Sequence, residues 1–346
     1  EYFQPPIERG KIVNFELLGP VPGFIVSRQL YGGFPPSDNL PDTPGYPVRS
    51  LVFDDKNDFG PRFGLAWQPS WWKDFVVRGG YGIYYTQEIS NSFTVLTLNP
   101  PIVRNFSFES TYDKPLPVDK VFLGQGREVT GQFGTQSVDP HLRDNYFQQW
   151  NITMQKKLPA AIYLDVGYVG SKGTNLVIGY DGNRPIQVVT PGPGVPPVAA
   201  RRPFAGFGFM SVAKSVGNST YHSLQAKAER RVSRGLSFIG SYTWSKALSA
   251  MDQSTVGGGF HSAGVQDIFN LRGEKAPAAF DLAHRFSLAA VWDLPLLARG
   301  GHPALRALLG GWQLSAIVTE QIGFASTLSG VGDTTGTGIS SRPDMI

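Results

Sequence analysis

The sequence predicts an all-β fold, an antiparallel transmembrane β-barrel, from three observations. Apolar and polar residues alternate with period two in about eight segments, and this period places one set of residues on each face of a strand. The segments run roughly 9–13 residues, whereas strands of soluble sheets have about 5–6 and a tilted strand needs about 9–11 to cross a bilayer. Tight turns and long loops alternate between the segments, which is the layout of outer-membrane barrels.

The expected strands all show this alternation. In residues 75–85, Val77, Tyr81 and Ile83 define an apolar face, and Arg78 and Gly80 lie on the other. The same pattern predicts seven further strands: 59–68, 146–158, 162–170, 220–232, 236–248, 284–294 and 312–322. These eight or more strands are expected to form a barrel or part of a larger one.

The connections are of two kinds, expected to be short periplasmic turns and long extracellular loops. The short turns are 69–73, 158–161 and 233–235, and the long loops are 86–145, 172–219 and 249–283. Residues 295–311 exceed the length of a tight turn, and their 304–309 stretch is predicted to form a short helix. The 41 Gly and 27 Pro of the chain are typical of extensive turns and loops.

The composition excludes several classes of protein. The net charge is only +4, and the basic residues form no tract beyond pairs such as Arg201-Arg202, which excludes a nucleic-acid partner. The chain has no Cys, so disulfides and thiolate metal sites are excluded. No run of about 18 apolar residues occurs, which excludes a transmembrane helix, and no signal peptide is recognisable.

Aromatic residues near the strand ends predict two bands at the membrane interfaces. Trp67, Trp71, Trp72 and Trp312 fall near the short turns, and Tyr84, Tyr85, Trp150, Tyr242 and Trp244 fall nearer the long loops; Trp292 is also expected at an interface. The alternative is that aromatic residues simply favour strands.

The polar face of the strands is the candidate ligand-binding surface, because it is expected to point into the barrel lumen. The candidates are Arg78, Gln149, Asn151, Asp165, Gln225, Lys227, Glu229 and Arg231. The alternative is that these side chains satisfy one another, or contact a plug domain, through ion pairs and water. The two-residue spacing of Lys227, Glu229 and Arg231 predicts a charge ladder across strands.

No catalytic, cofactor or metal site is predicted, and the chain is not expected to be an enzyme. The five His lack metal-ligand spacing, and residues 54–58 are interpreted as a solvated acidic loop rather than a calcium loop. No nucleophile elbow, phosphate loop or dinucleotide fingerprint occurs. Four loop aromatics, expected to stack on sugars or to hold loop cores, are Phe106, Tyr112, Phe204 and Phe207.

Several segments resemble the Oar-like TonB-dependent transporters. They are DFGPRFGLAW (58–67), VRGGYGIYY (77–85), QQWN (148–151), GYVGSKG (167–173), YHSLQ (221–225), SYTWSK (241–246), FDLAHRF (280–286) and GGWQLS (310–315). Each motif is loose, but their order and spacing are specific and cover nearly the whole chain. The resemblance implies a receptor in the outer membrane of a Gram-negative bacterium.

The resemblance also implies partners. A full-length receptor of this kind contacts outer-membrane lipid, holds a plug domain inside its barrel and takes energy from the TonB complex; other envelope proteins are further candidate partners. Residues 1–346 are expected to be a single barrel domain or barrel fragment, with no plug domain, TonB-contacting segment or regulatory domain. The interpretation preferred here is therefore the barrel portion of an uptake receptor.

Two other interpretations stay open at this point. Eight strands can close into a small barrel filled with side chains, which would serve as an anchor, a surface-display scaffold or a structural partner in the envelope. A soluble β-sandwich also has strands with one face in a core.

Overall fold

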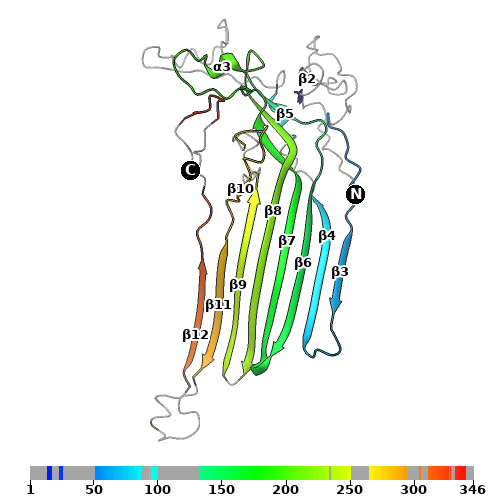
Figure 1. Ribbon diagram of the computed structural model, residues 1–346, viewed down its shortest axis with the longest axis vertical. Helices are drawn as coiled ribbons and strands as arrows, with labels where there is room; N and C mark the ends of the chain where they lie inside the picture. The colour runs from blue at the N-terminus through cyan, green and yellow to red at the C-terminus, as the bar shows by residue number, and fades with distance from the viewer. Residues whose placement is uncertain are drawn as a thin grey trace.

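The computed structural model describes residues 14–17, 23–25, 51–86, 93, 95–99, 133–233, 235–250, 265–294, 304, 311–326, 328 and 332–339. Long antiparallel strands dominate this part of the chain (Figure 1). Among the described residues, no helix has the length and apolarity needed to span a membrane.

Eight long strands form one sheet in the order β12-β11-β9-β8-β7-β6-β4-β3. They are β3 (Arg62–Trp67), β4 (Phe75–Thr86), β6 (Asn145–Leu158), β7 (Ile162–Asp181), β8 (Phe207–Ser233), β9 (Leu236–Ser249), β11 (His284–Asp293) and β12 (Gln313–Gln321). Each matches one of the strands expected from period-two alternation, and consecutive long strands pair antiparallel. The antiparallel all-β prediction is confirmed.

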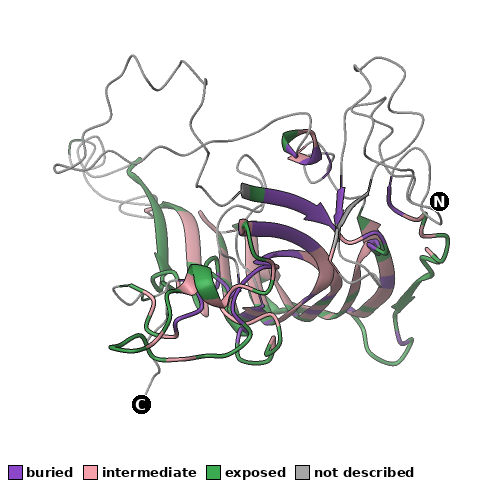
Figure 2. Cartoon of the chain, turned by 90° about the horizontal axis from the view of Figure 1, so that it is seen from above, coloured by how far each residue is buried: buried purple, intermediate pink, exposed green. Residues whose placement is uncertain are grey.

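The sheet is curved and open. Seen from the loop end, its strands follow an arc (Figure 2), and β3 and β12 are the two edges of the path. Within the described residues these two edges do not pair with each other, so the eight strands do not close into the small barrel considered above.

Strand register carries the alternation continuously across the sheet. Val77 is opposite Met154, Met154 is opposite Val166, and Val166 is opposite Ala226, which makes an apolar row over four strands. The neighbouring row begins with Arg78 and continues through polar and small residues. A slip of one residue in any pair would move a whole strand to the wrong face, so the two faces together fix the register.

The predicted loop 172–219 is wrong in part, because β7 continues to Asp181 and β8 begins at Phe207. The extensions pair with each other beyond two irregularities near Leu176. Residues of both faces are buried there: Ile178, Tyr180 and Met210 on one face, and Asp181, Ser211 and Ala213 on the other. Burial on both faces removes the polar half of the alternation, which is why the pattern did not reveal these strand ends.

A second unexpected strand lies within the predicted loop 86–145. β5 (Phe133–Val138) pairs parallel with the outer end of β8, and the purple strands of Figure 2 show how buried this region is. The side-chain amide of Asn14, in β1 (Asn14–Glu16), bonds the backbone of Val138 in both directions, with lengths of 2.8 and 2.9 Å. β1 also pairs with β2 (Gly23–Ile25).

Short elements complete the loop end. Leu51, Val52, Phe93, Leu96, Val138, Leu142 and Ala213 form one buried cluster, and Ile178, Tyr180, Val212 and Val265 form another. The minor elements are η2 (Val95–Leu98), α3 (Val198–Arg201) and β10 (Ala276–Pro277). The loops therefore contain small cores of their own, which we call the loop cap.

Tight turns join β6 to β7 and β8 to β9 at the opposite end. η3 (Pro159–Ala161) joins β6 to β7, and Ala160 and Ala161 both have positive φ, at 60° and 58°. Gly235 has a φ of +78° in the turn between β8 and β9, a conformation that favours glycine. The predicted helix at 304–309 lies outside the described residues except for position 304.

Candidate functional site: the polar face of the sheet

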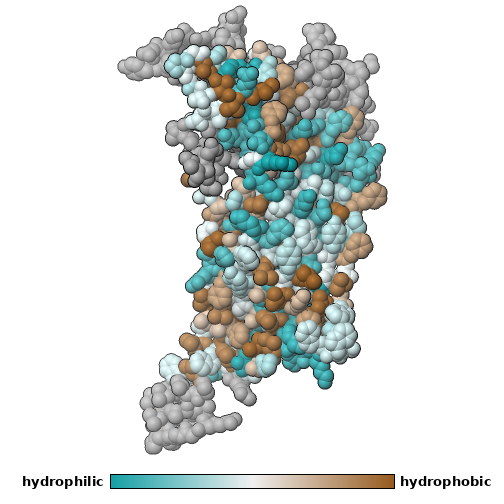
Figure 3. Space-filling model, viewed as in Figure 1, coloured by the Kyte–Doolittle hydropathy of each residue, from teal (hydrophilic) through white to brown (hydrophobic). Residues whose placement is uncertain are grey.

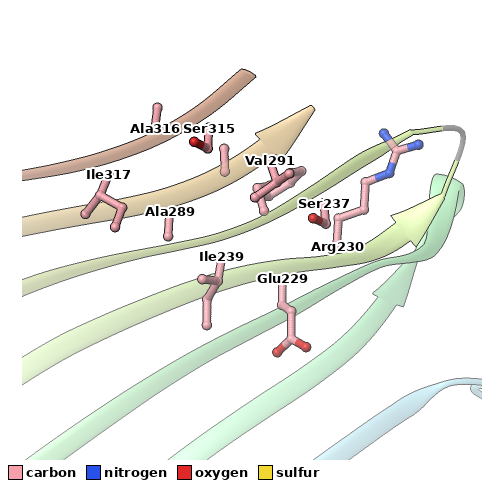
Figure 4. Close-up of a pocket in the computed structure, with 11 residues that line it drawn as sticks. Glu229, Arg230, Ser237, Ile239, Ala289, Val291, Ser315, Ala316 and Ile317 are labelled. Carbon is pink, nitrogen blue, oxygen red and sulfur yellow. The ribbon is translucent and has the colours of Figure 1, made fainter. Parts of the chain in front are cut away.

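The polar face is the hollowed side of the sheet. A cavity of about 700 Å³ lies against β8, β9, β11 and β12 (Figure 4). Alternate residues of these strands contribute its polar-face lining: Glu229, Ser237, Ile239, Ala289, Val291, Ser315 and Ile317. These positions share a face with the predicted lumen residues, because register connects Glu229 to Ile239, Ala289 and Ile317 in one row.

Charged side chains lie beside this cavity on β8. Lys227 Nζ is 2.9 Å from Glu229 Oε2, and Arg231 Nε is 3.8 Å from Glu229 Oε1. The ion pairs run along one strand, which corrects the predicted cross-strand ladder. Asp165 is opposite Lys227 in register, but the nearer partner of Lys227 is Glu229. A cation thus lies on either side of one carboxylate.

The remaining lumen candidates lie on the same face. Arg78 donates to Gln155 Oε1 at 3.2 Å, and Gln225 donates to Ser223 Oγ at 3.1 Å. Gln149 and Asn151 are exposed on β6, opposite Gly82 and Gly80 of β4. The eight candidates therefore share one surface across β4, β6, β7 and β8, although they do not converge on a point.

The polar face changes character along the sheet. Charged residues cluster on β8, whereas Ile239, Ala289, Val291 and Ile317 form an apolar patch on β9, β11 and β12. Ile317 is 85% exposed. This patch was not predicted from the sequence. The apolar residues Ile239 and Ile317 occupy polar-face positions of their strands, and this departure from the alternation could have revealed it.

The opposite face holds the large exposed apolar side chains. Examples are Leu65, Ile152, Met154 and Trp244, each 45–61% exposed. In Figure 3, hydrophobic patches spread over the lower part of the strands and hydrophilic residues gather toward the loop end. An exposed apolar surface of this extent fits a lipid-facing wall.

The predicted interface aromatics fall into groups. Near the turns, the Trp67 and Trp71 rings meet edge-on at 5.8 Å, and Trp72 stacks on Phe75 at 4.1 Å. Trp292 and Trp312, on either side of the β11–β12 connection, are exposed at the same end. Toward the loops, Tyr85, Trp150, Tyr242 and Trp244 lie on the apolar face. Their role at an interface stays a prediction.

Tyr84 is placed differently from the prediction. It alternates with Tyr85 and so shares the polar face with Arg78. The guanidinium carbon of Arg62 lies 4.6 Å from the centre of its ring. Counting aromatics near a strand end cannot separate neighbours, whereas strand alternation does.

Two tyrosine–histidine pairs on the apolar face were not foreseen. The Tyr168 hydroxyl lies 2.7 Å from His222 Nδ1, and the Tyr242 hydroxyl lies 2.8 Å from His284 Nδ1. Each pair joins adjacent strands diagonally. The sequence could have indicated these pairs, because His222 and His284 are polar residues at apolar-face positions of their strands.

Two ion pairs, each with a buried partner, hold the loop cap. Asp181 pairs with Arg202 at 2.9 Å, with side-chain exposures of 0% and 10%. Arg184 pairs with Asp267 at 2.5 Å and is 5% exposed. Asn183 donates to three backbone carbonyls of residues 204–208. The cap is therefore a packed structure in which side-chain hydrogen bonds and ion pairs join the loops to the strand ends.

The predicted loop aromatics lie partly within the described residues. Phe204 and Phe207 pack against Phe15 at 6.1 and 5.6 Å, which favours the loop-core interpretation; Phe106 and Tyr112 lie outside the described residues. His141 stacks on Phe53 at 4.6 Å. No group of three or more His, Cys, Asp and Glu able to hold a metal occurs in the described part of the chain.

These features define a class of protein. Long antiparallel strands with one apolar face and one polar, hollowed face, joined by turns at one end and loops at the other, make the wall of a transmembrane β-barrel. The whole chain, residues 1–346, matches the family described as "Outer membrane beta barrel domain". The chain belongs to that family, and its location is the outer membrane of a Gram-negative bacterium.

Solved structures with a similar fold are outer-membrane transporters and receptors. The Escherichia coli outer membrane transporter YddB is 12% identical, with a TM-score of 0.42 over 69% of this chain and 27% of its own. The Neisseria meningitidis iron transporter FrpB is 9% identical, with a TM-score of 0.35 over 68% and 24%. The Pseudomonas aeruginosa ferric enterobactin receptor PfeA, as a double mutant, is 10% identical, with a TM-score of 0.35 over 78% and 32%.

The chain thus spans about a quarter to a third of the length of these structures. Comparison with curated proteins finds no match.

Proposed function

We propose that this chain is the barrel portion of a TonB-dependent outer-membrane receptor that takes up a ligand from outside the cell. The observation that carries the proposal is the polar, hollowed face of a sheet whose other face suits lipid. The small anchoring barrel of eight strands would have an interior filled by its own side chains. Here the described strands leave a cavity of about 700 Å³ and a row of partly exposed ions on that face.

Family membership and the sequence motifs support the same proposal. The chain belongs to an outer-membrane barrel family, and its ordered motifs resemble Oar-like transporters. The open edges at β3 and β12 also favour a larger barrel, because unpaired edge groups in lipid cost several kcal/mol each. A single barrel domain or fragment over residues 1–346, with a plug and the TonB complex as partners of the full-length protein, stays part of the proposal.

A second function is favoured by one observation, the loop cap. Its two ion pairs and two apolar clusters give the extracellular side a fixed shape, which suits a scaffold that displays a binding surface. In that function the barrel anchors the cap, and no ligand crosses the membrane.

Uptake can be tested in cells without knowing the ligand. The composition of spent growth medium is compared by mass spectrometry among wild-type cells, a deletion of the full-length gene and cells depleted of TonB. Uptake predicts at least one compound that wild-type cells deplete several-fold more than the other two strains do. A deletion strain whose medium matches that of the wild type, with the protein present in the wild-type membrane, contradicts uptake and favours the scaffold.

A further inference from the structure

One cluster on the apolar face is chemically unlike the lipid-facing wall around it. Lys172 of β7, His222 of β8 and Lys246 of β9 lie on this face at the loop end of the strands. His222 and Lys246 are direct partners in register. Lys172 stands one row nearer the loops, opposite Thr220. At the usual strand spacing the two lysines are roughly 10–12 Å apart.

The charges of this cluster are only partly compensated. Lys246 Nζ lies 3.2 Å from the buried carboxylate of Asp281, yet the Lys246 side chain is still 52% exposed. Asp281 also accepts a hydrogen bond from the Ala247 backbone at 2.7 Å. Lys172 is exposed and has no ion-pair partner among the described residues. The cluster therefore has a net positive charge at the loop end of the apolar face.

Aromatic rings lie beside the two lysines: Trp150 shares a register row with His222 and Lys246, and Tyr168 lies one row nearer the turns. The Trp150 and His222 rings are 6.0 Å apart, and Tyr168 stacks near His222 at 6.1 Å. Trp150 reaches across Gly170, where an added Cβ would come within 2.3 Å of the ring. In the tautomer in which the Tyr168 hydroxyl donates to Nδ1, the His222 proton is on Nε2 and is available to a ligand.

Cations beside exposed aromatic rings suit phosphorylated sugars, because the lysines can pair with phosphate while an aromatic ring offers a flat apolar face to a sugar ring. The loop end of the barrel faces the outside of the cell, so this height is that of the outer-leaflet headgroups. We propose that Lys172, His222 and Lys246, with Trp150 and Tyr168, form a binding site for a phosphorylated glycolipid of the outer leaflet. The site is independent of any ligand taken up through the barrel.

The test uses the full-length protein, purified in detergent from outer membranes and examined by native mass spectrometry with added lipopolysaccharide. The variant K172Q/K246Q is expected to retain at least tenfold less glycolipid than the wild type. The variant K172R/K246R keeps both charges and is expected to retain it normally. The matched control K73Q/K156Q removes two lysines at the turn end, where Lys156 Nζ bonds the Lys73 carbonyl, and is expected to behave as the wild type.

The arms of this experiment separate the sources of binding. Dephosphorylated glycolipid is expected to bind the wild type as weakly as intact glycolipid binds K172Q/K246Q. Equal retention of intact glycolipid by the wild type and K172Q/K246Q overturns the proposal. So does a wild-type protein that retains dephosphorylated glycolipid as well as it retains intact glycolipid. Full displacement by millimolar inorganic phosphate also overturns it, because the site would then be a simple anion site. A folded K172R/K246R protein that retains no glycolipid excludes charge as the basis of binding.

Discussion

Asp181 and Arg202 form an ion pair of 2.9 Å in which the carboxylate is fully buried, at the point where β7 leaves the membrane-spanning sheet. The same carboxylate accepts backbone hydrogen bonds from Asn183 and Met210 at 2.9 and 3.0 Å. One side chain thus joins the end of β7, the beginning of β8 and the loop between them. This arrangement makes the loop cap an extension of the sheet.

The substitution D181N is expected to loosen the cap. It leaves Arg202 buried without its counter-charge, and breaking a buried pair in this way costs about 3–5 kcal/mol. Hydrogen exchange should show faster exchange of the Asn183 and Met210 amides, with little change in the centre of β8. The control D54N removes an exposed pair with Lys56 at 3.9 Å and should leave exchange unchanged. Equal protection in D181N would show that the pair does not hold the cap.

The loop that follows β12 is expected to loosen in acid through Asp333. Burial raises the pKa of this carboxyl, but hydrogen bonds from the Gly338 backbone, the Thr335 hydroxyl and the Thr337 and Thr335 backbone outweigh burial and lower the pKa overall. A folded-state pKa below the unfolded value gives stability that is complete above about pH 4, the ordinary aspartate range, and is lost as pH falls through the folded pKa.

Limited proteolysis from pH 6 down to pH 2.5, with an acid-active protease, measures this effect. Cleavage within residues 332–339 should rise as Asp333 becomes protonated. The variant D333N cannot ionise and should be cleaved at the same high relative rate at every pH. A wild-type profile parallel to that of D333N would assign the acid sensitivity to other groups.

Gly170 is expected to be intolerant of a side chain because Trp150 occupies its space. A Cβ at Gly170 would lie 2.3 Å from the Trp150 ring, whereas a Cβ at Gly240, on the same face, would meet Leu288 at 3.5 Å, an ordinary contact. G170A should therefore lower the free energy of unfolding by about 1–3 kcal/mol, the usual cost of overpacking, while G240A stays near the wild type. Urea titration of the folded fraction in detergent measures both.

A double-mutant cycle identifies the clash. In a W150A background, G170A should cost much less, because the ring that it meets is absent. An unchanged cost in that background would place the strain in the backbone instead.

The ions beside the cavity are expected to matter for binding and not for folding. Lys227 and Glu229 have side-chain exposures of 41% and 34%, and exposed ion pairs add little stability. E229Q should keep the wild-type unfolding midpoint in urea while changing, several-fold, the accumulation of any compound found in the spent-medium experiment. Loss of folded protein in E229Q would instead show that the ion pairs hold the strand.

The sequence by itself determined the long strands, their order and their two faces. Period-two alternation, as in residues 75–85, survives in the sequence wherever one face meets lipid and the other meets water, because the two environments demand opposite residues. The turn at Gly235 was also predictable, because a glycine separates two alternating segments there and glycine favours turns.

Only the tertiary structure decided the loop cap and the partners within each face. The outer ends of β7 and β8 are covered on both sides, so no alternation marks them. β5 pairs with a strand about 75 positions away, and Asn14 bonds Val138 across 124 positions. The partner of Lys227 and the approach of Trp150 to His222 depend on register and rotamers. Register and rotamers are set by packing between strands, and the sequence of one strand does not specify which side chains of the adjacent strand it contacts.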